Sequence, residues 1–179
     1  MRKEDAMEQD AALSDLPTKP GSDWLIEAKR YLHGAEILRA SRKPLLITPT
    51  LHLLGHGIEL FLKANLILEG ETADEARSFG HDIWRLWRDD RSATARRDVA
   101  ATAEEEWNAA KLDPRWTDDF NEPATVQLEE YLRRLSQLHS RDTDYALRYP
   151  RPDGTEGPKP HLLVPTFERT ADKYIREKL

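Results

Sequence analysis

The chain has 179 residues, a length typical of one domain, and it carries a formal net charge of −6 at pH 7. This negative charge argues against non-specific coating of nucleic acids or membranes, because both are anionic surfaces. The sequence contains no cysteine, which excludes disulfides, thiolate metal sites and cysteine nucleophiles. No signal peptide is visible at the N-terminus, and no apolar run reaches the roughly 20 uninterrupted residues of a membrane span. We therefore expect a cytoplasmic protein without a membrane partner.

The first half of the chain predicts an extension followed by two long helices. Residues 1–21 are polar, and we expect them to form a flexible N-terminal extension before a single domain over residues 22–179. A helix is predicted to start near Ser22 or Asp23, either of which is a good N-cap residue, because apolar residues then recur three and four positions apart. A second helix is predicted from about 50 to 68, with Gly70 ending it as a C-cap glycine.

The second half predicts further helices separated by loops. In chain order we expect a connector over 71–80, a short helix with Ile83, Leu86 and Trp87 on one side, a long helix over 92–112, a loop held by Trp116 and Phe120, a helix over 124–139, irregular chain from Tyr149 to Pro165, and a last helix started by Pro165. Only Leu162 to Val164 resembles a strand. The sequence therefore predicts an all-α protein, an up-and-down bundle of four to five main helices.

Three local motifs occur in order along this predicted bundle: HGIELFLKANLILEG, in which Glu59 and Lys63 are four residues apart, then FGHDIWRLW over residues 79–87, then YALRYP over residues 145–150. Together with the opening DWLIEAKRYLHGAEIL, they resemble the HEPN family, the helical domain named for higher eukaryotes and prokaryotes and for nucleotide binding. The resemblance covers about residues 22–150.

The resemblance implies a four-helix core that is often dimeric, and in catalytic members a metal-independent ribonuclease site with an R-x4-6-H motif. The segment RRLSQLH supplies this motif twice, as Arg134 to His139 and as Arg133 to His139. Leu135 follows Arg134, where the family commonly has a polar residue. Many HEPN-like proteins are thought to have kept binding without cleavage.

The chemistry of these residue types suits a phosphate. Histidine can activate a 2′-hydroxyl while arginine stabilises the phosphorane, so Arg133, Arg134 and His139 are the candidate catalytic residues. On a regular helix Arg134 and His139 lie about 140° apart, so they converge only if the helix frays or if two subunits contribute. Residues 131–151 carry five arginines and two aspartates, a local net charge of +3. The alternative is that these groups complement the helix dipole and pair with Glu129 and Glu130.

Further candidate ligand-binding residues come from the other motifs, and each has a structural alternative. They are Tyr145, Arg148, Tyr149, Glu59, Lys63 and His81. Tyrosine rings can stack on a base while Arg148 holds a phosphate, or the segment can anchor a loop with Arg148 paired to Glu59. His81 can also form a hydrogen bond to the long helices.

His52 and His56 form an H-x3-H pair on one helical face, and Glu59 follows on the same side. Zinc or iron would need a further ligand there, from His81, His33 or His139. The alternative is a hydrogen-bonded polar seam, and since no second H-x3-H or E-x-x-H motif exists, we expect no metal and no cofactor.

Three functions remain open from the sequence. The first is an HEPN-like binding module for an RNA or nucleotide phosphate, or for a protein partner, in a stress, toxin–antitoxin or other defence system. The second is a metal-independent endoribonuclease, and the third is a metal-binding bundle. We expect a homodimer and no sequence-specific DNA binding.

Overall fold

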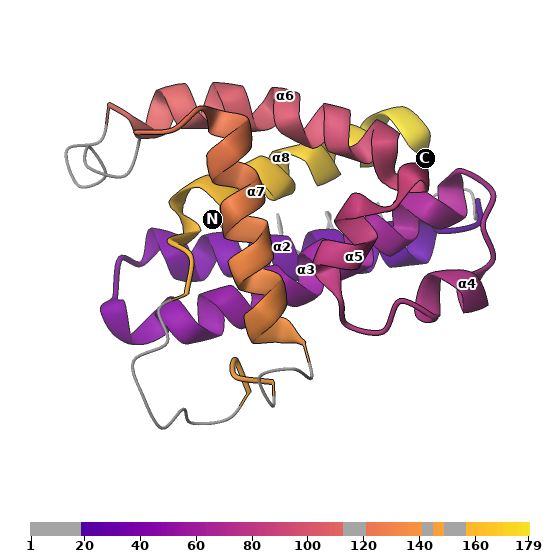
Figure 1. Ribbon diagram of the computed structural model, residues 1–179, viewed down its shortest axis with the longest axis horizontal. Coiled ribbons are helices and arrows are strands. Elements are labelled where there is room, and N and C mark those ends of the chain that lie inside the picture. Colours follow the sequence, from indigo (N-terminus) through magenta and orange to yellow (C-terminus); the bar gives the residue numbers. More distant parts are fainter. Residues whose placement is uncertain (1–18, 113–120, 141–144, 149–156) are drawn as a thin grey trace, which may run out of the picture.

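The computed structural model describes residues 19–112, 121–140, 145–148 and 157–179. In these residues every regular element is a helix, so the predicted all-α fold class is confirmed. The elements are α2 (Ser22–Ala40), the 3-10 helix η1 (Pro44–Leu46), α3 (Ile47–Leu68), α4 (Ala73–Arg77), α5 (Ile83–Arg88), the 3-10 helix η2 (Asp90–Ser92), α6 (Ala93–Ala110), α7 (Ala124–His139) and α8 (Pro160–Lys178) (Figure 1). The predicted extension (residues 1–18) and the loop residues Trp116 and Phe120 lie outside the described residues.

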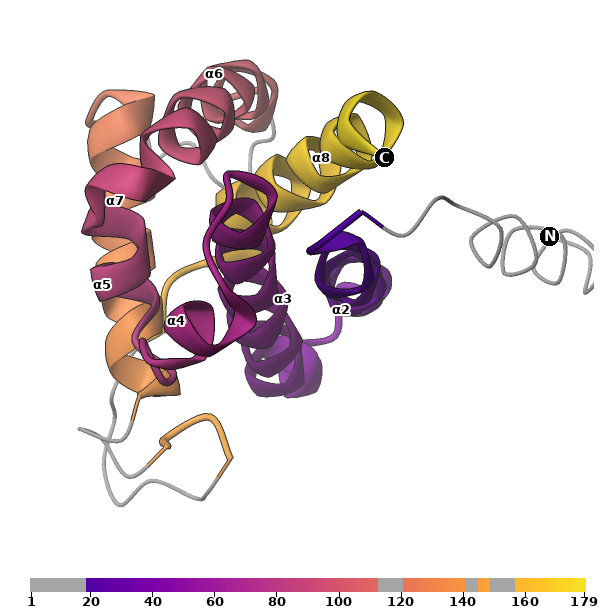
Figure 2. The same ribbon diagram turned by 90° about the vertical axis from the view of Figure 1, so that its right-hand side faces the viewer.

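Four long helices, α2, α3, α6 and α8, run along the long axis of the molecule and alternate in direction (Figure 1). The fifth, α7, crosses the others and brings its C-terminal end to α3. In the end-on view α3 occupies the centre, with α2, α8, α7 and α5 around it (Figure 2). Because α3 has neighbours on most sides, it must be apolar around most of its circumference, which explains why it is the most apolar stretch of the chain.

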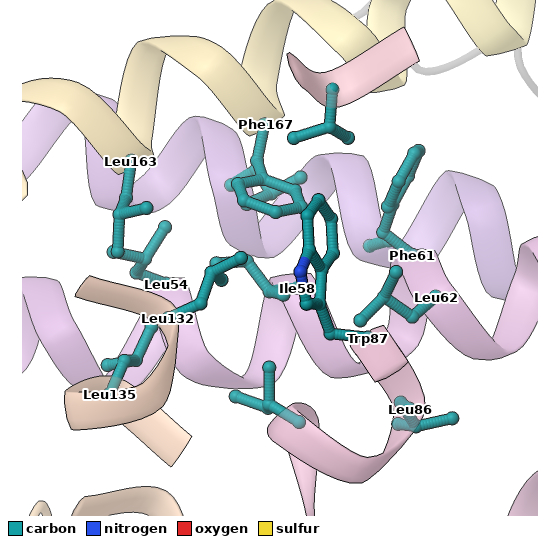
Figure 3. Packing of buried hydrophobic residues seen from close by; sticks show 14 of the residues in the cluster. Leu54, Ile58, Phe61, Leu62, Leu86, Trp87, Leu132, Leu135, Leu163 and Phe167 are labelled. Carbon is teal, nitrogen blue, oxygen red and sulfur yellow. The ribbon is translucent and has the colours of Figure 1, made fainter. Parts of the chain in front are cut away.

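The core is built where α3, α5, α7 and α8 meet. The indole of Trp87 on α5 lies 6.4 Å from the ring of Phe167 on α8, which in turn contacts Phe61 on α3 at 5.9 Å, both edge to face (Figure 3). Ile58 of α3 and Leu132 of α7 are fully buried in the same cluster. Burial of these rings and of the surrounding aliphatic side chains stabilises the bundle, since each large apolar side chain contributes about 1.5–3 kcal/mol.

Local sequence signals set several helix ends. Gly70 ends α3 in a left-handed conformation with φ of 108°, and the hydrogen bonds from Gly70 to Ile67 and from Glu71 to Leu66 complete a Schellman motif. The helix α2 begins at Ser22, as predicted, but its N-cap is Gly21 with φ of 87° and neither Ser22 nor Asp23. The prediction for the C-terminus of α3 is therefore confirmed, and that for the cap of α2 is wrong.

Three further boundaries differ from the sequence prediction. The helix α3 begins at Ile47, and α4 forms inside the predicted connector, where Thr72 and Glu75 make a reciprocal capping box. The helix α8 begins at Pro160, so Pro165 lies inside a helix and does not start it. The run from Leu162 to Val164 is helical and fully buried. The burial of these three side chains offsets the cost of about 3 kcal/mol of an internal proline.

The segment Pro44–Leu68 is the one candidate membrane span that the described residues contain, by length and composition alone. Half of its most apolar 18-residue stretch is buried inside the protein. The core helix of a helical bundle is also this long and this apolar.

Two glycines on facing helices differ sharply in the space around them. A Cβ on Gly57 of α3 would lie 2.8 Å from Cγ of Leu32 and 3.2 Å from its backbone nitrogen, so α2 approaches α3 closely there. A Cβ on Gly34 of α2 would meet only the end of the Leu53 side chain, at 3.3 Å. The bare backbone at Gly57 is therefore required by packing.

We expect Gly57→Ala to lower the free energy of unfolding by about 1–3 kcal/mol, because the added methyl group overpacks the α2–α3 contact. Gly34→Ala is the matched control and should change stability by no more than about 1 kcal/mol, since alanine is the better helix former. Urea denaturation of the two variants measures both values. Equal stability of the two proteins would contradict the close approach at Gly57.

Candidate functional site

A buried carboxylate in the middle of α3 is the centre of the candidate site. The side chain of Glu59 is 4% exposed, and both of its oxygens accept hydrogen bonds. Lys63 Nζ donates to Oε1 over 2.7 Å, while His81 Nδ1 and His139 Nε2 donate to Oε2 over 2.9 Å and 2.8 Å. Lys63 also donates to the Gly80 carbonyl over 2.7 Å. One carboxylate thus joins α3, the loop before α5 and the end of α7.

A second set of hydrogen bonds holds the two histidine-bearing segments together. Asp82 caps the N-terminus of α5, and Ser136 of α7 donates to its Oδ1 over 3.2 Å. The hydroxyl of Ser136 also accepts from the Trp84 backbone N–H over 2.9 Å. Because Ser136 lies one turn before His139 and Asp82 follows His81, these bonds fix both imidazoles relative to each other.

The hydrogen bonds keep Glu59 ionised despite its burial. Burial alone would raise the pKa of this carboxyl, but the hydrogen bonds from His139, Lys63 and His81 outweigh it and lower the pKa to about 2. An ionised carboxylate inside a protein is stable only when such partners surround it. The four residues are therefore one electrostatic unit.

Two further histidines of α3 lie beside this unit. Burial lowers the pKa of His52, and the positive charges of His139 and Arg148 lower it further. Burial also lowers the pKa of His56, although the Glu59 carboxylate opposes the shift. Both imidazoles are consequently neutral at pH 7. His52 Nδ1 is buried and has no hydrogen-bond partner within the described residues.

The segment Tyr145–Arg148 packs against the end of α7. The Leu147 N–H donates to the Leu138 carbonyl over 3.3 Å, and Tyr145 adopts a left-handed φ of 54°. The Tyr145 ring meets His81 edge to face at 5.9 Å, and the Arg148 guanidinium lies 4.8 Å above the same ring. Arg148 stacks on Tyr145 and does not pair with Glu59, while Tyr149 lies outside the described residues.

The R-x4-H motif is divided between two carboxylates. Arg133 Nη2 and Arg134 Nε pair with Glu130 over 2.8 Å and 2.6 Å on the exposed side of α7. His139 pairs with Glu59, and its side chain is only 1% exposed. The helix α7 is regular through His139, so the fraying that would bring the arginines to this histidine within one chain is absent from this helix.

Among the described residues, one group of metal-binding atoms differs in part from the H-x3-H hypothesis. One ligand atom each of His56, Glu59 and His139 lie within 4.8 Å of one another. The hypothesis paired His56 with His52, four residues earlier, and named His139 among the possible further ligands. In the structure the carboxylate of Glu59, three residues after His56, is the side chain that faces His139. The H-x-x-E spacing was the available signal, because residues three apart also share a helical face.

Gly55 lies directly against the His139 ring. A Cβ at this position would be 2.9 Å from Nδ1 and 3.2 Å from Cγ of that imidazole. The histidine therefore sits on bare backbone of α3, one turn from the carboxylate that it binds.

Comparisons of the chain with family models, with curated proteins and with solved structures find no match.

We expect stability to depend on the charge of Glu59 in acid. Because folding lowers the pKa of this carboxyl from 4.5 to about 2, its contribution is complete above pH 4.5 and is lost as the pH falls toward 2. Glu59→Gln should therefore be less stable than wild type at pH 7, and the difference should shrink as the pH falls from 4.5 to 2. Urea denaturation across this range measures it.

The control is Glu130→Gln, which removes an exposed carboxylate that pairs with Arg133 and Arg134. Exposed ion pairs contribute about 0–1 kcal/mol, so the free energy of unfolding of this variant should stay close to that of wild type across the pH range. A constant difference between wild type and Glu59→Gln at all pH values would contradict the assignment of a buried, ionised Glu59.

Proposed function

We propose that this chain is an HEPN-like module that binds a phosphate-bearing ligand, RNA or a nucleotide, at the surface formed by His81, Tyr145 and Arg148. The ordered motifs that resemble the HEPN family and the all-α bundle support the family assignment. Two of those motifs, FGHDIWRLW and YALRYP, supply all three residues of this surface.

The position of Arg148 carries the proposal. Its side chain is exposed, it stacks on Tyr145, and no carboxylate of the described residues pairs with it. A stacked guanidinium keeps its N–H groups free to bind a phosphate in a bidentate manner. The imidazole of His81, 39% exposed, and the Tyr145 ring add aromatic surface on which a base can stack.

The arginines of α7 are the competing location for a phosphate. Arg133 and Arg134 are also exposed, but both share the carboxylate of Glu130. A phosphate would have to compete with that carboxylate, and no aromatic ring of the described residues stacks on either guanidinium. Because no carboxylate of the described residues neutralises Arg148, we propose that the phosphate binds at Arg148 and not at Arg133 and Arg134.

We expect Arg148→Ala to weaken binding of a fluorescein-labelled single-stranded RNA, and of ATP, by at least about tenfold, since it removes a charge-assisted hydrogen bond. Arg133→Ala is the matched control and should leave the affinity within about twofold. Fluorescence anisotropy in EDTA at low salt measures RNA affinity, and calorimetry measures ATP affinity. A wild-type protein that binds neither probe, or an equal loss in both variants, would contradict this site.

A second candidate function, metal-independent cleavage of RNA, is favoured by the pair formed by Glu59 and His81. The carboxylate accepts from Nδ1, an arrangement that orients Nε2 of the partly exposed imidazole to take a proton. Two histidines contact Glu59. His139 is buried and His81 is partly exposed, so His81 is the one that an RNA can reach.

Cleavage predicts that wild-type protein in EDTA converts a labelled RNA to shorter products on a denaturing gel, and that His81→Ala reduces the rate by about 100-fold or more. Circular dichroism and thermal unfolding check that the variant is folded. Intact RNA after prolonged incubation with wild type would rule out cleavage and leave the binding function untouched.

A further inference from the structure

We propose that His56, Glu59 and His139 form a binding site for one divalent transition-metal ion, Zn²⁺ or Fe²⁺. This site differs from the phosphate surface in residues and in ligand. It also differs from the H-x3-H pair predicted from the sequence, since His52 is not part of it.

The three ligands converge from two helices onto one buried point. His56 and Glu59 lie three residues apart on α3, and His139 reaches them from the last turn of α7. Their ligand atoms lie within 4.8 Å of one another. Metal–ligand bonds of about 2.0–2.2 Å place two tetrahedral ligands about 3.4 Å apart, so the widest pair must close by about 1.4 Å at most. Side-chain rotation can supply a movement of this size.

The ligand types select the class of ion. Two imidazoles and one carboxylate are the protein ligands of His₂Glu zinc sites and of two-histidine, one-carboxylate iron(II) sites. A site of this kind disfavours Mg²⁺ and Ca²⁺, which prefer shells made of oxygen alone. Three protein ligands also leave a coordination position for water or for a ligand oxygen.

The surrounding groups already orient two of the ligands. Lys63 holds Oε1 of Glu59, which leaves Oε2 to coordinate an ion through a single oxygen. The Tyr31 ring packs edge to face against His56 with centroids 4.4 Å apart. Ordered neighbours of this kind fix ligand orientation at metal sites.

An ion would replace existing hydrogen bonds. Oε2 now accepts from His139 Nε2 and from His81 Nδ1. Coordination through Nε2 requires that this nitrogen carry no proton, so His139 would bind the ion as a neutral imidazole with its proton on Nδ1, and a proton leaves to solvent only from the doubly protonated ring. The ammonium of Lys63 opposes a second cation, but the Gly80 carbonyl shares its charge. A hydrogen-bonded network without metal is the competing state, and it predicts the opposite result in the experiment below.

The test uses the full chain, stripped with EDTA and dialysed, and titrated with Zn²⁺ by calorimetry and with Co²⁺ by visible absorption. Wild type should bind one ion per chain, and the Co²⁺ complex should show the absorption bands of a low-coordinate nitrogen and oxygen site. His56→Ala should weaken Zn²⁺ binding by about 100-fold or more, because it removes a direct ligand without removing a hydrogen bond to Glu59.

Two controls separate this site from other histidines. His52→Ala changes the imidazole one turn away on the same helix, and His33→Ala changes an exposed imidazole that contacts Glu168 at 3.3 Å. Both should retain wild-type affinity and stoichiometry. Wild type without Zn²⁺ binding, or His52→Ala weakening it as much as His56→Ala, would overturn the proposal. The RNA and ATP measurements are made in EDTA, so failure of either proposal leaves the other intact.

Discussion

The structure depends on one buried negative charge. Glu59 lies in the most enclosed helix of the bundle, where an unpaired carboxylate would cost several kcal/mol. Its partners come from its own helix, from the loop before α5 and from the end of α7, which are 4, 22 and 80 residues away in sequence. Apolar contacts can slide, whereas hydrogen bonds to a charge have a fixed length and direction. The carboxylate therefore determines where α7 ends against α3.

The candidate site around Glu59 has an enclosed part and a solvent-exposed part. The groups that contact Glu59 are mostly enclosed, and they are oriented before any ligand arrives. The partly exposed ring of His81, which belongs to this unit, contacts the Tyr145 ring edge to face, and the exposed Arg148 stacks on Tyr145. A ligand at the surface would therefore meet side chains whose positions are set from beneath. Such preorganisation reduces the entropy lost on binding.

Periodicity alone predicted the long helices well. The bounds of α7 and the C-terminal end of α3 follow from apolar spacing and from a glycine, which are local signals. The helix α8 was predicted to start five residues late, because prolines at 160 and 165 were interpreted as breaks when one is a first helical residue and the other is tolerated by a buried stretch. Burial is decided by tertiary contacts, so no local rule could have corrected this.

The candidate site was predictable only in part. The Glu59–Lys63 spacing indicates a pair on one helix, and a hydrogen bond from His81 to a long helix was among the expectations. That His139 faces the same carboxylate depends on how α7 crosses α3, which the sequence does not encode locally. The R-x4-H motif groups His139 with Arg133 and Arg134, its neighbours along the chain, and the metal hypothesis named His139 only as one of three possible further ligands.

Two glycines of α3, Gly55 and Gly57, leave the helix backbone bare at two points, and a different neighbour packs at each. At Gly57 the backbone of α3 receives Leu32 of α2, and at Gly55 it receives the imidazole of His139. The two positions thus act as independent spacers, one for the distance between helices and one for the distance between imidazole and carboxylate. Enlarging residue 55 by a single methyl group would displace the imidazole and leave the α2 contact in place. A substitution at Gly55 alone therefore changes the position of His139 against Glu59 and leaves the packing of α2 on α3 unchanged.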